Sequence, residues 1–369
     1  MKGGATAMTS IPEAGQGQSV LMAGPVAEIL AADRFPFENV LLARERYSYE
    51  GNWLFCAFDQ ADIVAARIGF GLGRFYWQDY GLEAQQGSSV PVAYRLEVVT
   101  PAGVHACLYS DQHMGVAVKS DPTSMEIRFS TDSMELFHLH GWPQMSWQYR
   151  SPDAAITAEL QLSLQNMAVW PDCIMPNNTF SMCIGVGAVR GGISIGGRRF
   201  EVTGGAVYDH PRVVVHPNAV PLFGWYLYAP LRFPDGTFVV SYYSEDGSGR
   251  KDDRYSTGFV TLPDGSSRWL RNAQISRLEI GRDGLPTAWE AQLAGEAVSI
   301  SYRTRIADLS SIGASAPSDS DHPTGKYLAF PLLMDTEGEC RMDGVTTQLR
   351  HGSGIAEFLV RKGHQPVFP

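Results

Sequence analysis

Hydrophobic and polar residues alternate with a period of two along much of the chain, which is the pattern of half-buried β-strands. The clearest stretch is 158–165, where leucines alternate with polar residues, and 94–100 and 124–130 show the same period. A short helical pattern is confined to residues 26–32. The sequence therefore predicts an all-β protein with little helix.

Glycine-rich and Asp-Gly turns separate the expected strands. Gly196-Gly197 predicts a hairpin with a two-residue turn. Pro234-Asp-Gly236 predicts a second hairpin, between strands at 222–228 and 237–243. The spaced glycines of 69–73 are not followed by a helix and predict a flexible turn. Short strands joined by frequent turns are typical of antiparallel barrels or sandwiches rather than of βαβ units.

The length of 369 residues suggests two domains, at roughly 150 residues for each. We expect a mobile N-terminal lead-in with a short helix at 1–35, one β-domain at 36–215 and a second at 216–369. Residues 310–325 are rich in Ser, Asp and Pro, which predicts a polar loop. Met8 is as plausible a start as the first methionine.

Composition narrows the possible functions. The 29 basic and 39 acidic residues give a net charge of −10 without a basic block, which argues against nucleic acid as a partner. The five cysteines show no CxxC spacing, so we expect reduced thiols rather than disulfides or a zinc site. Neither a secretory signal nor a long apolar run is evident, which predicts a cytoplasmic protein without stable membrane insertion. The oligomeric state stays open.

Several motifs of common enzyme classes are missing from the sequence. It contains no P-loop and no HExxH, and neither a GxSxG nor a dinucleotide-binding glycine motif is placed between a strand and a helix. A standard hydrolytic triad, phosphoryl transfer and hydride transfer therefore lack their usual signals.

One candidate for chemistry is the Tyr208-Asp209-His210-Pro211 segment, which follows the Gly204-Gly205 pair near the expected domain junction. Asp209 could be a general acid, because burial against aromatic rings raises the pKa of a carboxyl group. His210 would then orient Asp209 or manage water. The alternative is a turn in which Asp209 is a cap and His210 bonds to a backbone carbonyl.

The run from Val186 to His210 resembles the junction segment of the CrtC/AttH-type lipocalin-like proteins. That group includes carotenoid 1,2-hydratase, kievitone hydratase and the lipocalin-like Diels–Alderases, with tocopherol cyclase as a more distant relative. The shared features are a strand, a Gly-rich turn, a second strand and a Gly-x-Tyr-x-Asp-His element. A Trp-rich strand and an Asp-Gly turn follow, matched here by Trp225 to Gly236.

The resemblance implies two tandem lipocalin-like antiparallel β-barrels, no metal and no organic cofactor. It also implies a hydrophobic isoprenoid or polyketide as substrate. Family members often continue Asp-His-x-Trp-Gly, whereas Pro211-Arg-Val213 follows here. A tryptophan that helps to shape the family's pocket is therefore missing at that place.

Aromatic residues are numerous, with 8 Trp, 15 Tyr and 17 Phe. A barrel mouth lined by such rings offers apolar area and ring faces that stabilise a developing cation, although core packing is the alternative for each ring. The expected substrate-binding residues are Trp225, Tyr228, Trp77, Tyr208, Trp142 and Tyr242.

His138-Leu-His140 places two imidazoles on one face of a strand, as in cupin metal sites. No glutamate follows within four residues and Gly141 and Pro143 end the strand, so we predict no metal.

The leading hypothesis is a cofactor-independent enzyme that hydrates, isomerises or cyclises an alkene-bearing isoprenoid or polyketide. A non-catalytic carrier of a hydrophobic ligand is the alternative, and a cupin-like metal enzyme is a weaker one. The carrier needs the same aromatic lining but no proton donor.

Overall fold

The computed structural model describes the backbone of residues 22–25, 48–72, 92–111, 115–121, 124–130, 135–140, 144–151, 153–175, 178–215, 224–253, 255–307 and 327–361. Side chains are described for residues 51–71, 96–105, 144–151, 153–169, 182–211, 224–253, 255–307 and 331–360. The described residues contain strands, turns and bends and no helix, which confirms the all-β prediction.

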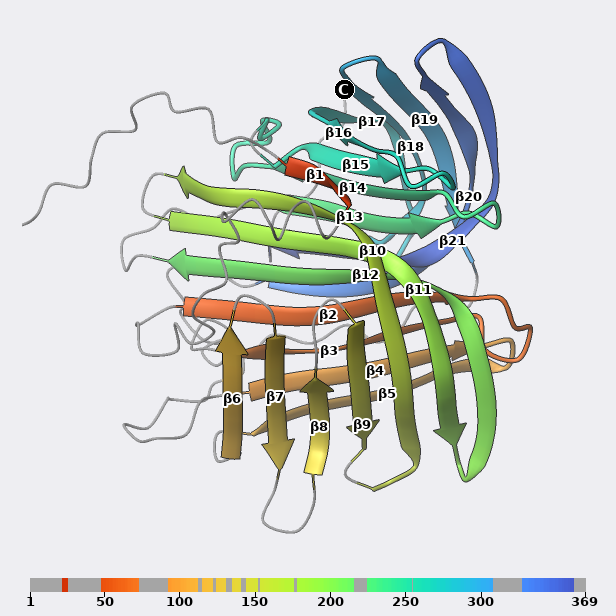
Figure 1. The fold of residues 1–369 in the computed structure, drawn as a ribbon. Helices are drawn as coiled ribbons and strands as arrows, with labels where there is room; N and C mark the ends of the chain where they lie inside the picture. Colours follow the sequence, from red (N-terminus) through yellow and green to blue (C-terminus); the bar gives the residue numbers. More distant parts are fainter. Residues whose placement is uncertain are drawn as a thin grey trace, which may run out of the picture.

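Two antiparallel sheets make up the fold (Figure 1). The strands of the first sheet are β1 (Met22–Pro25), β2 (Ser48–Phe58), β3 (Ala65–Leu72), β4 (Val92–Thr100), β5 (Gly103–Asp111), β6 (Gly115–Asp121), β7 (Ser124–Ser130), β8 (Glu135–His140), β9 (Gln144–Arg150), β10 (Ile156–Met175), β11 (Asn178–Ile195) and β12 (Arg198–Val215). The strands of the second sheet are β13 (Trp225–Arg232), β14 (Phe238–Glu245), β15 (Thr257–Thr261), β16 (Ser267–Leu270), β17 (Asn272–Ile280), β18 (Pro286–Gly295), β19 (Val298–Ile306), β20 (Tyr327–Met342) and β21 (Val345–Arg361).

Both sheets have the same connectivity. In the first sheet β2 pairs with β12, the last strand, and the order runs from β5 through β2 and β12 to β6. In the second sheet β13 likewise pairs with β21, and the order runs from β16 through β13 and β21 to β17. Each sheet is thus an up-and-down meander that curls on itself. It is open between two strands that follow each other in the chain, β5 and β6 in the first sheet and β16 and β17 in the second. The first forms a half-barrel and the second a nearly closed barrel.

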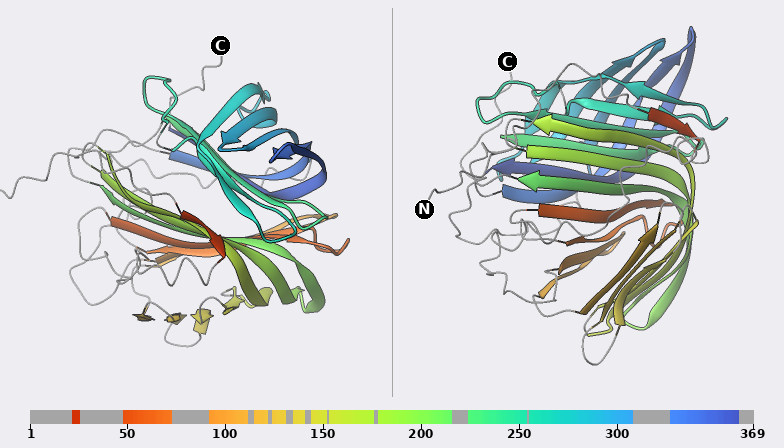
Figure 2. Two further views of the ribbon diagram at one scale, coloured as in Figure 1. Left: turned by 45° about the horizontal axis from the view of Figure 1, so that its top comes forward. Right: turned by 60° about the vertical axis from the view of Figure 1, so that its left-hand side comes forward.

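The two sheets lie face to face, with β12 and β2 of the half-barrel against β13 and β21 of the barrel (Figure 2). Each sheet has its own apolar interior, and a third cluster of buried residues lies between the sheets. A strand presents alternate residues to opposite faces, so strands such as β12 contribute to an interior on one side and to the interface on the other. The alternation therefore decides which side chains of β12 face the second sheet and which face the interior of the half-barrel.

Several local predictions are confirmed. The Gly196-Gly197 turn has positive φ at both positions and joins β11 to β12, as a two-residue hairpin requires. β13 and β14 form the expected hairpin, with Gly236 at a φ of 93° in the turn. The alternating stretch 158–165 lies within β10.

Other local predictions are wrong or lie outside the described residues. Gly69 to Leu72 belong to strand β3 and not to a flexible turn. A side chain at Gly69 would collide with the ring of Trp53, so this glycine makes room for an aromatic residue of the neighbouring strand. Within the lead-in, β1 pairs with β10. The expected helix at 26–32 and the polar loop at 310–325 lie outside the described residues.

The sheets approach closely at Gly205. A Cβ atom built there would lie 2.4 Å from Cδ of Arg232 and 2.6 Å from Cζ of Phe238, both in the second sheet. Beside this contact, Nη1 of Arg232 donates to Oδ1 of Asp59 at 2.6 Å, which ties β13 to the end of β2. Gly205 therefore sets how near the two sheets can come.

We predict that Gly205→Ala destabilises the folded protein, because even a methyl group forces Phe238 or Arg232 to move. Overpacking of this kind costs about 1–3 kcal/mol. The midpoint of thermal unfolding measures the effect. Glu201→Ala on the same strand, at an exposed position, is the control, and a surface change there is expected to cost about 0.5 kcal/mol or less. Equal midpoints for the two variants would contradict the prediction.

Candidate functional site

Asp209 lies within β12 and faces the second sheet. The strand continues through His210 and Pro211, so the interpretation of Asp209 as a turn cap is wrong. Its register partners are Ile184 of β11 and Trp53 of β2, and both belong to the apolar cluster between the sheets. With only 7% of its surface exposed, Asp209 is a carboxyl group placed in a largely apolar interface.

His210 points to the other side of β12. Its register partner Cys183 belongs to the interior of the half-barrel, and its ring lies 6.0 Å from that of Tyr208, which has the same orientation. The hydroxyl of Tyr208 donates to Oδ1 of Asn52 at 2.6 Å inside that half-barrel. The hypothesis that His210 orients Asp209 therefore does not fit the alternation of the strand.

The second sheet contributes tyrosines to the Asp209 face. Tyr228 on β13 and Tyr242 on β14 have ring centroids 5.9 Å apart, and Tyr226 stacks on Tyr242 at 5.1 Å. From the first sheet, Phe55 meets the edge of the Tyr228 ring at 5.4 Å. Aromatic rings from both sheets thus surround the position of Asp209.

Two polar atoms in this aromatic environment have no hydrogen-bond partner. They are Oδ1 of Asp209 and the hydroxyl of Tyr228, and both are shielded from solvent. A buried polar atom that bonds to nothing costs about 1–3 kcal/mol, and such atoms are rare in folded proteins. A ligand with matching polar groups would satisfy both.

The pKa of Asp209 is raised well above the usual value for an aspartate. Burial is the main cause because it disfavours the charged form, and the negative charge of Glu357 adds to it. Burial also raises the pKa of Tyr228, with further contributions from Asp209 and Glu357. Tyr228 therefore keeps its proton near neutral pH, and Asp209 keeps its proton to higher pH than an ordinary aspartate does.

Glu357 belongs to a buried ionic network that joins the sheets. Nη1 of Arg67 on β3 donates to Oε2 of Glu357 on β21 at 2.9 Å, and Nε of Arg67 lies 2.9 Å from Oε2 of Glu97 on β4. The hydroxyl of Tyr226 donates to Oε1 of Glu357. The guanidinium of Arg67 also lies over the ring of Trp53, 5.5 Å from its centroid.

The other predicted site residues do not all lie at the interface with Asp209. Trp225 lies in the interior of the second sheet, where its Nε1 donates to Oε2 of Glu245 at 2.7 Å. Trp77 and Trp142 lie outside the described residues. Of the six expected substrate-binding residues, Tyr228 and Tyr242 are brought to Asp209, whereas Tyr208 and Trp225 face the two interiors.

The predicted site residues do not include Trp53, Phe55, Arg67, Tyr226 and Glu357, of which only Tyr226 belongs to the aromatic strands that the sequence indicated after Asp209. A usable signal was present for the charged residues, since Arg67 and Glu357 are each isolated in an apolar strand. A buried charge requires a partner, so two such residues of opposite sign predict a pair.

His138 and His140 lie on β8, but their side chains are outside the described set. Among the side chains that the structure describes, no group of three His, Cys, Asp or Glu residues could hold a metal ion. The metal-free site stays a prediction. No helix that could cross a membrane occurs in the described part of the chain.

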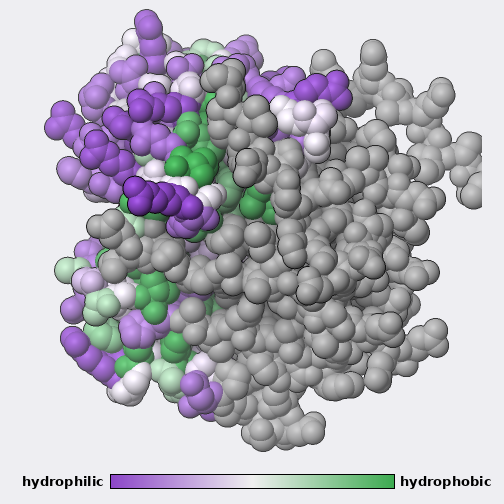
Figure 3. Space-filling model, turned by 180° about the vertical axis from the view of Figure 1, so that it is seen from behind, coloured by the Kyte–Doolittle hydropathy of each residue, from purple (hydrophilic) through white to green (hydrophobic). Residues whose placement is uncertain are grey.

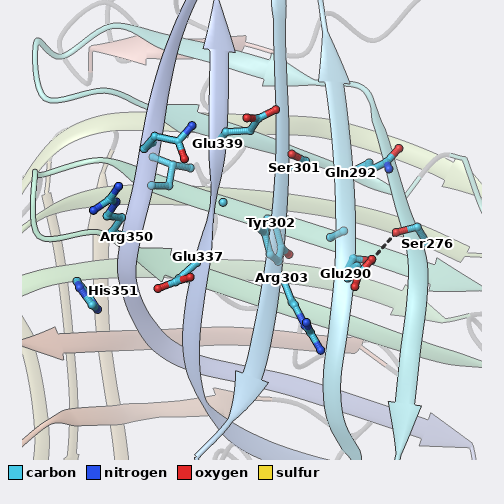
Figure 4. Close-up of a pocket in the computed structure, with 14 residues that line it drawn as sticks. Ser276, Glu290, Gln292, Ser301, Tyr302, Arg303, Glu337, Glu339, Arg350 and His351 are labelled. Atoms are coloured by element: carbon cyan, nitrogen blue, oxygen red, sulfur yellow. Dashed lines mark hydrogen bonds between the residues drawn. The ribbon is translucent and has the colours of Figure 1, made fainter.

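A separate groove of about 590 Å³ lies across β17 to β21 (Figure 4). Polar side chains line much of it, including Glu290, Arg303, Glu337, Glu339 and Arg350. The groove contains none of the predicted site residues. The described surface seen from behind is also largely hydrophilic in this part of the molecule (Figure 3).

Comparisons with known proteins agree with the fold. No protein-family model matches the chain, and no curated protein matches it. Among solved structures, it is similar to a protein described as a putative AttH from Nitrosomonas europaea, with a TM-score of 0.53 and 11% identity over 88% of this chain and 97% of that one. The lipocalin-like fold implied by the resemblance is therefore confirmed.

Two further solved structures are similar at lower scores. Kievitone hydratase from Nectria haematococca has a TM-score of 0.48 and 9% identity, over 89% of this chain and 94% of that one. CghA, solved with Sch210972, has a TM-score of 0.46 and 12% identity, over 93% of this chain and 100% of that one.

The raised pKa of Asp209 makes a prediction about stability. Unfolding returns this carboxyl to water, where it loses its proton above about pH 4. Between that pH and the folded-state pKa, the folded state binds more protons than the unfolded state, so stability falls as pH rises. Relative to wild type, Asp209→Asn should therefore gain in free energy of unfolding as pH increases through this window. Urea unfolding at a series of pH values measures the difference.

Asp264→Asn is the matched control. Asp264 lies in an exposed turn, and a hydrogen bond from the Ser266 side chain lowers the pKa of its carboxyl. This group contributes stability that is present above the unfolded-state pKa and lost as pH falls, so the control should show the opposite trend. A difference between wild type and Asp209→Asn that is the same at every pH would contradict the prediction.

Proposed function

We propose that this protein is a cofactor-independent enzyme that protonates an alkene in a largely apolar isoprenoid or polyketide, with Asp209 as the general acid. The observation that carries the proposal is the pair of buried polar atoms without partners, Oδ1 of Asp209 and the hydroxyl of Tyr228, in the aromatic interface between the sheets.

The chemistry follows from the state of Asp209. The protonated carboxyl transfers its proton to one carbon of the alkene, and the π electrons form the new C–H bond. The adjacent carbon then carries positive charge, which the carboxylate and the ring faces of Tyr228, Tyr242 and Phe55 stabilise. No strong nucleophile is needed on the protein.

Three outcomes are open to the resulting cation. Water attacks it and releases a proton in a hydration, or a neighbouring carbon loses a proton in an isomerisation. In a cyclisation, a second alkene of the same molecule attacks it, and the new cation formed on that alkene then loses a proton from an adjacent carbon. Each route returns one proton to Asp209. Burial and the charge of Glu357 favour that return because they disfavour the ionised aspartate.

Substrate reaches this region from the partly exposed side of the interface. Trp53 and Tyr226 are half-buried, and 19% of the Glu357 side chain is exposed. The partly exposed groups lie next to the more deeply buried Asp209, so an apolar chain can enter beside them with its reactive alkene toward the carboxyl.

We predict that Asp209→Asn keeps the fold and the affinity for ligand but lowers turnover by about a hundredfold or more, since an amide cannot deliver the proton. The ligand is first identified by mass spectrometry of an organic extract of the purified protein, and turnover is then measured with it. Asp264→Asn in the exposed turn is the control and should leave turnover unchanged. Equal turnover in Asp209→Asn and wild type would contradict the proposal. A ligand that is bound and released unchanged by wild type would favour the carrier.

We predict that Tyr228→Phe lowers turnover by about tenfold, the value of one hydrogen bond to the substrate. The same change removes a buried hydroxyl without a partner, so the midpoint of thermal unfolding should stay the same or rise. A structural tyrosine would show the reverse, with a lower midpoint and unchanged turnover.

A further inference from the structure

The pairing of β12 with β2 is interrupted directly after Asp209. Register partners on β2 run without a gap from Gly204 to Asp209 and resume only at Arg212. On its other side, β12 pairs with β11 continuously through Pro211. Proline has no N–H to donate to a ladder and is rare in a strand with neighbours on both sides. Asp209 is therefore the last residue of a continuous ladder, next to a break between two central strands.

A side-chain hydrogen bond spans this break. The hydroxyl of Tyr208 on β12 donates to Oδ1 of Asn52 on β2 at 2.6 Å. The register places Asn52 opposite His210, within the interrupted part of the ladder. The bond lies on the half-barrel side of the sheet, because Tyr208 belongs to that interior whereas Asp209 faces the second sheet. It thus ties the two strands together directly behind the residue that carries the carboxyl group.

Stability alone does not explain this buried pair. Tyr208 and Asn52 are both 0% exposed, and the Tyr208 ring packs against Trp147 with centroids 6.1 Å apart. Nδ2 of Asn52 has no hydrogen-bond partner in the described part of the chain. A buried donor left unsatisfied costs as much as one neutral hydrogen bond contributes, or more, whereas two apolar residues would avoid that cost. What the pair provides is a fixed geometry between β2 and β12.

Asp209 needs such a fixed geometry. A general acid must stay within a fraction of an ångström of its productive place, since a small displacement from the reacting atom lowers the rate. Oδ1 of Asp209 accepts no hydrogen bond that could hold it. The place of the carboxyl group therefore depends on the backbone that carries it, and the ladder with β2 ends at this residue.

We propose that Tyr208 is a positioning residue, which holds β12 against β2 at the break through its hydrogen bond to Asn52 and so fixes the place of Asp209 in the interface. Tyr208, expected from the sequence to bind substrate, then acts from the opposite face of the strand. Its importance for catalysis rests on the proposed function. The environment of the Asp209 carboxyl group can be measured without substrate.

The experiment follows the carbonyl band of protonated carboxyl groups in the infrared spectrum as pH is raised. The part of this band that Asp209→Asn abolishes is assigned to Asp209. Burial is the main cause of the raised pKa of this carboxyl group, so a strand that separates from β2 and admits water lowers the pKa. In Tyr208→Phe, the midpoint of the Asp209 titration should therefore fall by about one pH unit or more.

The titratable groups that interact electrostatically with Asp209 are the same in this variant as in wild type. They are Cys183 on β11, Tyr228 on β13, Tyr242 on β14 and Glu357 on β21. A change in the midpoint therefore reports a change in the place or the hydration of the Asp209 carboxyl group.

A double variant, Tyr208→Phe with Asn52→Leu, separates positioning from stability. Replacing both partners by apolar groups of similar shape is nearly neutral for stability, because no buried donor or acceptor is left alone. The midpoint of thermal unfolding should stay near that of wild type, while the midpoint of the Asp209 titration still falls. A pair with a purely structural role would leave the Asp209 titration of the double variant as it is in wild type.

Tyr302→Phe is the matched control. The Tyr302 hydroxyl lies 2.6 Å from Oγ of Ser241 in a buried hydrogen bond of the second sheet, and Tyr302 belongs to the interior of the barrel. The same substitution thus removes a hydrogen bond of the same length away from the break between β2 and β12. It should lower the midpoint of thermal unfolding and leave the Asp209 titration unchanged.

An Asp209 titration that is the same as in wild type in both Tyr208→Phe and the double variant would overturn the inference. Where the two variants differ, or where only the double variant folds, the double variant decides. Failure of both to fold while Tyr302→Phe folds would also overturn it, because the fold itself would then require the pair. Full turnover in Asp209→Asn would instead overturn the proposed function and leave the effect of Tyr208 on Asp209 intact.

Discussion

The ion pair between Arg67 and Glu357 is the interaction on which the arrangement of the two sheets depends. It crosses the interface at 2.9 Å and joins β3 of the half-barrel to β21 of the barrel. A buried ion pair adds little net stability, because the charges must leave water, but removing one partner costs about 3–5 kcal/mol. Apolar packing brings the sheets together without fixing their alignment, whereas a pair of charges tolerates only alignments in which the two meet.

The same constraint determines the chemistry of the interface. Arg67 also lies 2.9 Å from Glu97, so one cation interacts with carboxylates of both sheets. Asp209 lies among aromatic rings at this interface, and burial together with the charge of Glu357 raises the pKa of its carboxyl group. The glutamate that helps to align the two sheets thus also acts on the protonation of Asp209.

Much of the fold follows from the sequence because it is encoded locally. The period of two in β10 and the Gly196-Gly197 turn each depend on residues close in sequence, and both were predicted. Gly69 was misinterpreted because its role depends on Trp53 of the neighbouring strand. Spaced glycines indicate a turn only where no side chain from elsewhere occupies the space.

The site was predicted less completely because it depends on contacts between distant strands. Asp209 was singled out through its aromatic neighbours and its likeness to a family segment. Glu357, whose charge acts on Asp209, is 148 positions further along the chain. The pairing of Asp209 with His210 failed for a simpler reason. Adjacent residues of a strand face opposite sides, so an Asp-His dipeptide can act as a unit in a turn but not in the middle of β12.

This alternation explains why the candidate site lies between the sheets rather than within one. The interior of the half-barrel contains Trp147 and Leu160, and that of the barrel contains Trp225 and Trp289, all almost completely buried. Close-packed interiors of this kind leave few voids for a ligand. Up-and-down barrels that bind ligands usually do so inside, with a solvated outer face. Here part of each outer face is apolar and covers the other, so a chain of two curled sheets gains an enclosed surface that neither sheet has alone. Asp209 comes from one sheet, and Tyr228 and Glu357 come from the other, so the proposed reaction requires both.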